Sequence, residues 1–232
     1  EWPLLLALPL AMLAGMACGV ANGWVTVRFA VPSFIVTLGM MQIARGLAYL
    51  GTDSQTKYIG KPVEWLGAPL PGIGISTAFL LAVAVVIAGQ LVLKRTVFGR
   101  YALVIGANEE AARLSGIHTR PVKIAVFAIA GTLSGLGAAF DSSRLAAVDP
   151  NAGLGLELSA ISAVVIGGTS LMGGRGSVIG SFLGVLIMAT LTAGLAQIGA
   201  TEPVKYLVSG HVIVFAVIID VWRAKKLKQI PS

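Results

Sequence analysis

The stretch STAFLLAVAVVIAGQLVL, residues 76–93, decides the fold. It contains no charged residue, and Lys94 and Arg95 follow it directly. A helix needs about 20 mostly apolar residues to cross the hydrocarbon core of a bilayer. The run is continuous rather than alternating, which favours a membrane helix over a barrel strand. Similar runs recur along the chain, so the sequence predicts an all-α protein that crosses the membrane several times.

The composition supports lipid as the main solvent. Of the 232 residues, 56% are apolar and only 12% are charged, whereas soluble domains carry about 25% charged residues. The mean hydropathy is +0.88. The net charge is +7, but the basic residues lie between the apolar runs. This pattern is typical of loop topology and predicts no nucleic-acid partner.

Seven membrane segments are expected, and the whole chain is predicted to be one transmembrane domain. The segments are 3–22, 33–50, 76–93, 122–141, 158–171, 178–196 and 205–222. The fifth is short and rich in glycine, so we expect it to be broken or re-entrant. The loop at 51–75 contains Pro62, Pro69 and Pro71 and is expected to be irregular, with a short helix on the membrane surface.

The basic residues predict the orientation. Together with Lys123, the segments 23–32, 94–121, 172–177 and the tail after 222 hold 12 of the 17 basic residues, all on one side. Because basic residues collect in cytoplasmic loops, this side is cytoplasmic, and so is the C-terminus.

A short capped helix is predicted inside the longest cytoplasmic connection, residues 99–117. Asn108 is a favourable N-cap, and the carboxylates of Glu109 and Glu110 suit the first turn of a helix. Gly116 is a natural stop. From the residues alone, a docking helix and a solvated loop helix without a partner are equally compatible with this pattern.

Glycines recur at a spacing of four residues, which places them on one helix face. One ladder is Gly15, Gly19 and Gly23, a second is Gly131 and Gly135, and a third is Gly176, Gly180 and Gly184. Such ladders let neighbouring helix backbones approach closely. The pattern predicts tight helix packing, and the alternative is a surface that slides during transport.

Three stretches resemble one family in the same order along the chain. They are VPSFIVTLGMM at 31–41, GANEEAARLSG at 106–116 and AVVIGGTSLMGGRG at 163–176. The second resembles the cytoplasmic coupling helix of bacterial ABC importer permeases. Together they resemble the ribose/xylose/galactose-type sugar permeases of the branched-chain amino acid/sugar permease superfamily. The resemblance extends over about residues 20–222.

The resemblance implies a permease subunit in the bacterial inner membrane. Such a subunit moves a monosaccharide, a pentose or a hexose, into the cytoplasm by alternating access driven by ATP hydrolysis on its partners. The implied partners are two cytoplasmic ABC ATPase subunits, a periplasmic sugar-binding protein, a second permease copy (identical or different) and membrane lipid. The family has about ten spans, so three would precede Glu1.

The resemblance also assigns residues. The coupling helix would dock on the ATPase through Asn108, Glu109, Glu110, Ala111, Ala112, Leu114, Ser115 and Gly116. ATP and Mg would be bound by the ATPase, and this chain would bind no cofactor and have no catalytic or metal-binding residue. The stretch from Gly168 to Gly173 has the spacing that begins a phosphate-binding loop, but Gly174 and Arg175 follow instead of Lys and Ser/Thr.

Polar residues within the spans are candidates for the sugar path, because polar groups at membrane depth are costly. They are Asn22, Ser33, Thr37, Gln42, Ser159 and Ser162. Each is equally a candidate for capping or bridging helices. Asp141 and Arg144 are spaced to pair, and His211 is expected to be a buried, hydrogen-bonded histidine. The outer stretch from Asp149 to Glu157 is a candidate surface for the binding protein.

Other functions stay open at this point. One is an ABC permease for another solute, such as branched-chain amino acids or a signalling sugar. A second is an ion-coupled secondary transporter or a channel, which would place coupling carboxylates at mid-membrane, whereas the acidic residues here lie mainly in loops and at helix ends. A third is an intramembrane enzyme, but the sequence contains no His-Glu-x-x-His pattern.

Overall fold

The structure, a computed structural model, describes residues 4–59 and 74–228. The described elements are, in chain order, α1 (Leu4–Phe29), α2 (Ser33–Thr52), β1 (Lys57–Tyr58), α4 (Thr77–Arg95), α5 (Val97–Ala107), α6 (Glu109–Leu114), α7 (Thr119–Leu145), β2 (Ala147–Val148), α8 (Leu156–Ile166), α9 (Val178–Gln197) and α10 (Glu202–Lys228). Contacts group the chain into two units, 1–84 with 116–152 and 85–115 with 153–232. The division falls inside α4.

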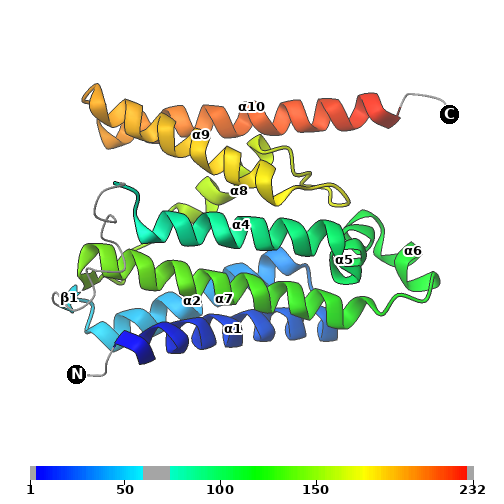
Figure 1. Ribbon diagram of the computed structural model, residues 1–232, viewed down its shortest axis with the longest axis horizontal. Helices are drawn as coiled ribbons and strands as arrows, with labels where there is room; N and C mark the ends of the chain where they lie inside the picture. Colours follow the sequence, from blue (N-terminus) through cyan, green and yellow to red (C-terminus); the bar gives the residue numbers. More distant parts are fainter. Residues whose placement is uncertain (1–3, 60–73, 229–232) are drawn as a thin grey trace. The chain divides into compact units, whose positions relative to one another are not determined.

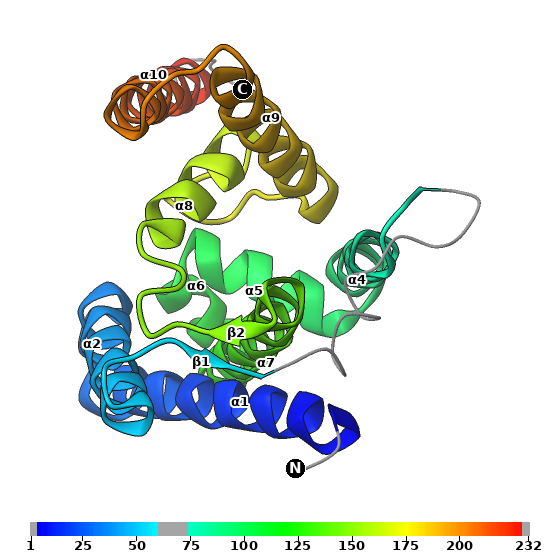
Figure 2. The same cartoon turned by 90° about the vertical axis from the view of Figure 1, so that its left-hand side faces the viewer.

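The first unit is built on a close antiparallel pair, α1 and α7 (Figures 1 and 2). Gly15 lies directly against Gly131, and Gly135 lies against Ala11. A Cβ at any of these glycines would overlap the facing carbonyl oxygen, so the two backbones touch. The packing role predicted for the two glycine ladders is therefore confirmed in this unit.

The first helix continues further than the sequence predicted. The expected segment ended at residue 22 and was followed by a loop, but α1 continues to Phe29. Gly23 still packs on α7, where a Cβ would lie 2.8 Å from the Cα of Ile124. The helix persists because its glycine face has a partner for one more turn.

A small ribbon that the sequence did not predict joins two distant segments of the first unit. Lys57 pairs with Val148 and Tyr58 with Ala147, in antiparallel register (Figure 2). Residues 60–73, where the surface helix of the outer loop was expected, lie outside the described residues.

In the second unit, α8 packs on α9 through the remaining ladder. Gly180 lies against Gly167, and Gly184 lies against the carbonyl of Ala163. The prediction placed Gly176 on the same helix face, which is wrong. Gly176 precedes α9, which begins at Val178, and a Cβ there would meet the side chain of Thr169 at 3.0 Å.

Burial is the reverse of the pattern in a soluble domain. The buried apolar residues of the described chain are mostly small or medium-sized: Ile105, Ala112, Ala147, Ala163, Val165 and Met188. Large apolar side chains such as Phe34, Leu47 and Leu50 are exposed. Small residues at helix contacts and large ones outside are expected where lipid is the solvent.

Within the described ranges, five helices are long and apolar enough to cross a membrane: α1, α2, α4, α7 and α9. The fifth predicted segment, 158–171, is a helix only as far as Ile166. At 11 residues, α8 is too short to cross about 30 Å of hydrocarbon, and a glycine-rich turn follows it. This agrees with the expected break. The last predicted segment lies inside α10.

Candidate functional site

The predicted short helix is present as α6. The Oδ1 of Asn108 accepts a hydrogen bond from the backbone N–H of Ala111 at 3.0 Å, which caps the N-terminus. Glu109 and Glu110 occupy the first turn. The hydroxyl of Ser115 donates to the carbonyl of Ala111 at 2.9 Å. Gly116, with φ of +82°, then ends the helix in a conformation that favours glycine.

One face of α6 is open and the other is covered. Leu114 is 79% exposed, although it lies outside the membrane-length helices. Glu110 and Ala111 are also exposed. Ala112 is only 1% exposed, so its methyl group holds α6 to the rest of the chain rather than facing outward. A single exposed leucine is common on protein surfaces, so Leu114 is compatible with a contact surface but does not by itself mark one.

The exposed face also carries an ion pair. Glu110 Oε1 lies 2.7 Å from Arg113 Nη2, and both side chains are about two-thirds exposed. The hydrogen bond and charge of Glu110 raise the pKa of Arg113. Three residues apart on a helix, the two groups order each other and fix where the carboxylate lies.

Removing the cap should loosen α6. We expect Asn108→Ala to destabilise the helix by about 1 kcal/mol, because the N–H of Ala111 loses its side-chain acceptor. Hydrogen exchange at the Ala111 amide measures this, and it should become several-fold faster. Asn108→Asp keeps an acceptor and should leave the exchange rate close to that of the unmodified protein. Equal rates in both variants would contradict the capping role.

Before α6, the chain forms a helix that the sequence did not predict. Thr96 caps α5, since its Oγ1 accepts from the N–H of Gly99 at 3.1 Å. Gly99 lies directly against the backbone of Val92 and Leu93 at the end of α4. Only glycine allows so sharp a bend between α4 and α5. In the sequence, the signal for the start of this helix was Thr96, a residue type that can cap a helix, three positions before Gly99.

The six predicted path residues are divided between the two units, four in the first and two in the second. In the first unit, Asn22 is buried, Ser33 and Gln42 are exposed, and the hydroxyl of Thr37 bonds to carbonyls of its own helix. In the second unit, the hydroxyls of Ser159 and Ser162 bond to the carbonyls of Gly155 and Leu158. All three hydroxyls bond to carbonyls of their own helices, which differs from the capping or bridging of helices that the alternative interpretation named.

Asn22 has a neighbour that sequence reasoning missed. Thr26 lies one helical turn further along α1 and is 5% exposed. Neither the Oδ1 of Asn22 nor the Oγ1 of Thr26 has a hydrogen-bond partner within the described residues. Their spacing of four residues places both on one side of α1.

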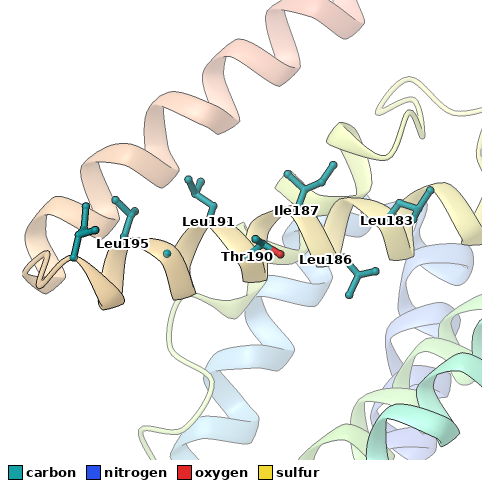
Figure 3. A pocket seen from close by; sticks show the side chains of 8 residues that line it. Leu183, Leu186, Ile187, Thr190, Leu191 and Leu195 are labelled. Carbon is teal, nitrogen blue, oxygen red and sulfur yellow. The ribbon is translucent and has the colours of Figure 1, made fainter. Parts of the chain in front are cut away.

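Two hollows of the second unit are apolar. One follows α9 alone and is lined by Leu183, Leu186, Ile187, Thr190, Leu191, Gly194, Leu195 and Ile198 (Figure 3). A second follows α10 and includes His211. Neither includes a predicted path residue. A lining with so few polar groups suits an acyl chain or another helix better than a sugar.

His211 is hydrogen-bonded but not buried. Its Nδ1 lies 2.7 Å from the carbonyl oxygen of Leu207, one turn earlier in α10. The side chain is exposed, because nothing in the described chain covers that face of α10. The predicted burial of His211 is therefore wrong for the isolated chain. The other predicted pair is confirmed, with Asp141 Oδ1 lying 3.2 Å from Arg144 Nη2.

The loop that follows β2 is held by a carboxylate. Asp149 accepts from the backbone N–H of Asn151 at 2.8 Å and from the hydroxyl of Thr56 at 3.2 Å. The hydroxyl of Tyr49 donates to the side chain of Asn151 at 2.6 Å. The bonds that Asp149 itself accepts, first the one from the Asn151 backbone and then the one from Thr56, hold the pKa of Asp149 below its ordinary value.

The lowered pKa of Asp149 predicts that the loop after β2 loses stability in acid. Because the folded pKa is depressed, the stabilisation is complete above the ordinary value of about 3.9 and is lost as pH falls through the lower, folded pKa. We expect hydrogen exchange at the Asn151 amide to speed up below about pH 4, after correction for intrinsic rates. Asp149→Ala, which has no acceptor, should exchange fast at every pH. A variant that kept the protection and its pH dependence would contradict this assignment.

Comparison with known proteins identifies the family. A family described as branched-chain amino acid transport system / permease component matches residues 1–217. The ribose import permease of Escherichia coli K12 is 36% identical over 221 residues, which is 93% of this chain and 68% of the relative. That of Bacillus subtilis is 40% identical over 209 residues, 86% of this chain and 62% of the relative.

The L-arabinose ABC transporter permease of Azospirillum brasilense is 34% identical over 212 residues, 91% of this chain and 62% of the relative. The chain thus spans about two-thirds of the length of these relatives. No solved structure matches it. With membrane-length helices, an all-α fold and a match along nearly its whole length, the chain belongs to the family of branched-chain amino acid transport system permease components.

Proposed function

We propose that the chain is the membrane-spanning subunit of a binding-protein-dependent ABC importer for a monosaccharide. In this proposal residues 1–232 act as a single permease domain in the bacterial inner membrane, with the C-terminus in the cytoplasm. The sugar crosses by alternating access, driven by ATP hydrolysis on partner subunits. The chain itself performs no chemistry.

The observation that carries the proposal is the similarity to named sugar permeases. Relatives named for ribose and for L-arabinose are 34–40% identical over 86–93% of the chain. Ribose and arabinose are both pentoses, which favours a pentose over a hexose as the substrate. The path for the sugar includes Asn22 at its cytoplasmic part, since a buried amide oxygen without a partner is free to meet a hydroxyl or a water molecule.

The docking site for the ATPase is the coupling loop at 99–117. The exposed face of α6, with Glu109, Glu110, Ala111, Leu114 and Ser115, would enter a groove of the ATPase, while Asn108 and Gly116 define the ends of the helix. Leu114 supplies apolar area and the carboxylates supply charge for basic groups on the partner. ATP and Mg are bound by that partner, and a periplasmic binding protein and a second permease copy complete the importer.

Reconstitution tests this function. The full-length protein is purified with whatever co-purifies, placed in liposomes, and supplied with candidate binding proteins. We expect ATP-dependent uptake of a pentose such as ribose or arabinose, with a co-purifying ATPase. Uptake that follows an ion gradient, without any associated ATPase, would contradict the proposal and favour a secondary transporter.

A branched-chain amino acid is the second candidate substrate, because the family description names it. Leucine and isoleucine therefore belong in the same uptake assay, each with a matching binding protein. ATP-dependent uptake of leucine and none of a pentose would keep the importer mechanism and replace the substrate.

A further inference from the structure

A glutamine of α4 caps the N-terminus of a different helix, α9. Gln90 is 7% exposed and lies in the apolar run that decides the fold. Its Oε1 accepts from the backbone N–H of Val178 at 2.8 Å and of Ile179 at 3.3 Å. These are the first two residues of α9, whose N–H groups have no partner within the helix.

The same helix start is held from a second side. The Oγ of Ser177 caps α9 by accepting from the N–H of Gly180 at 3.2 Å, and it also donates to the Oε1 of Gln90 at 3.3 Å. The Oγ1 of Thr169 accepts from the N–H of Ser177 at 3.4 Å and lies 3.2 Å from the hydroxyl of Ser181. Side chains from α4 and from the turn after α8 therefore converge on one helix end.

That turn is in backbone contact with the helix that carries the coupling loop. Gly173 lies directly against the carbonyl of Gly106, near the C-terminus of α5. A Cβ on Gly174 would lie 2.7 Å from the Cβ of Ala107, which is the residue before the N-cap of α6. No flexible side chain separates the two backbones, so a displacement of α5 must move the turn as well.

These contacts lie within one unit and form a closed path. It runs from α6 through α5 to the turn at 168–177, from the turn to the start of α9, and from α9 through Gln90 back to α4, which leads into α5. The glycine contacts between α5 and the turn are made by backbone atoms, whereas α4 is connected to α9 by the hydrogen bonds to one amide oxygen and by packing of the Val178 side chain near Gly89.

We propose that Gln90 is a positioning residue that makes α4, α5, α6, the turn at 168–177 and the start of α9 move as one body when the ATPase displaces α6. This inference rests on the proposed function, since it assigns the route by which movement of the coupling helix reaches a membrane span. Without the bond from Gln90, the path is open at α4, and movement of α5 reaches the start of α9 only through the turn at 168–177, so more ATP is hydrolysed per sugar transported.

The test compares two substitutions in the full-length, reconstituted importer. Gln90→Met keeps the length and apolar bulk of the side chain but removes the acceptor. Gln90→Glu keeps an acceptor, and its charge is favourable at a helix N-terminus. Gln197→Met makes the same change at an exposed glutamine at the end of α9. The measured quantity is ATP hydrolysed per sugar transported, in complexes that still contain the ATPase.

We expect Gln90→Met to raise this ratio roughly fivefold, since two amides lose their acceptor. Gln90→Glu and Gln197→Met should stay within about twofold of the unmodified importer. A merely structural role would lower the yield of assembled complex but leave the ratio unchanged. An unchanged ratio in assembled Gln90→Met complexes would overturn the inference.

A second measurement needs no substitution. If the helix end moves as one body with α4, the amides of Val178 and Ile179 stay protected from hydrogen exchange in the complex, both with and without nucleotide. Loss of protection in one state would overturn the inference. This readout is independent of substrate: failure to transport a sugar contradicts the proposed function, whereas exposure of these two amides contradicts only the role of Gln90.

Discussion

Gly131→Leu should prevent α1 from packing on α7. Gly131 and Gly15 face each other so closely that a Cβ on either would overlap the carbonyl of the other. A leucine side chain forces the helices apart and removes the contacts of the whole ladder, which in lipid are the main source of helix association. We expect a loss of about 3 kcal/mol or more in stability, at the upper end of overpacking effects. Thermal unfolding of the full-length protein in detergent measures this loss.

The same helix offers a matched control. Gly137 also lies in α7, but a Cβ there would meet nothing within 4 Å. Gly137→Leu adds the same side chain and removes the same flexible residue, and it should leave the melting temperature unchanged or slightly raised. If both variants melted at the same temperature, close packing at Gly131 would not be what holds the first unit together.

Glu110→Arg should abolish transport while leaving the membrane fold intact. Glu110 is exposed in the first turn of α6, where its carboxylate is favoured by the helix dipole and paired with Arg113. Reversal places two positive charges side by side on the face proposed to enter the ATPase. We expect association with the ATPase to weaken by about 2 kcal/mol, or roughly 30-fold, as found for charged contacts at interfaces. Co-purification and ATP-driven uptake measure the effect.

Two controls separate docking from helix stability. The swap Glu110→Arg with Arg113→Glu restores an ion pair within α6 but leaves the charge pattern reversed, so association should stay weak. Glu202→Arg breaks an equivalent pair in α10, where Glu202 lies 2.7 Å from Lys205, and association should be normal. Recovery of association in the swap would mean that the pair only stabilises α6, which would contradict a docking role for Glu110.

The elements that sequence reasoning predicted best depend on neighbouring residues only. The cap at Asn108, the acidic first turn and the stop at Gly116 all lie within nine residues, and each follows from local hydrogen bonding. The pair of Asp141 and Arg144 is local in the same way. The bend before α5 is also local, yet sequence reasoning missed it. The run that forms α4 was interpreted as a membrane span, and the residues after it, including Thr96 and Gly99, were interpreted as a loop.

The sugar path stays a prediction, because polar residues in a membrane helix can have two roles that look alike in the sequence. A serine or threonine in a membrane helix can satisfy its hydroxyl on its own backbone, as Thr37, Ser159 and Ser162 do. Sequence alone does not distinguish these residues from groups that face a cavity. The buried polar atoms without a partner, in Asn22 and Thr26, became visible only once the side chains were placed.

By itself, the sequence determined the solvent, the helical class and the short capped helix that begins after Asn108, because length, hydropathy and capping act over one helix or one turn. Only the tertiary structure showed which helix each glycine ladder packs against and that α1 continues to Phe29. It also showed that the side chain of Gln90 accepts hydrogen bonds from Val178 and Ile179. The contacts of α1 with α7 and of Gln90 with α9 join residues far apart along the chain, such as Gly15 with Gly131 and Gln90 with Val178. The close approach of two backbones depends on both partners at once, and no local pattern records which partner will be there.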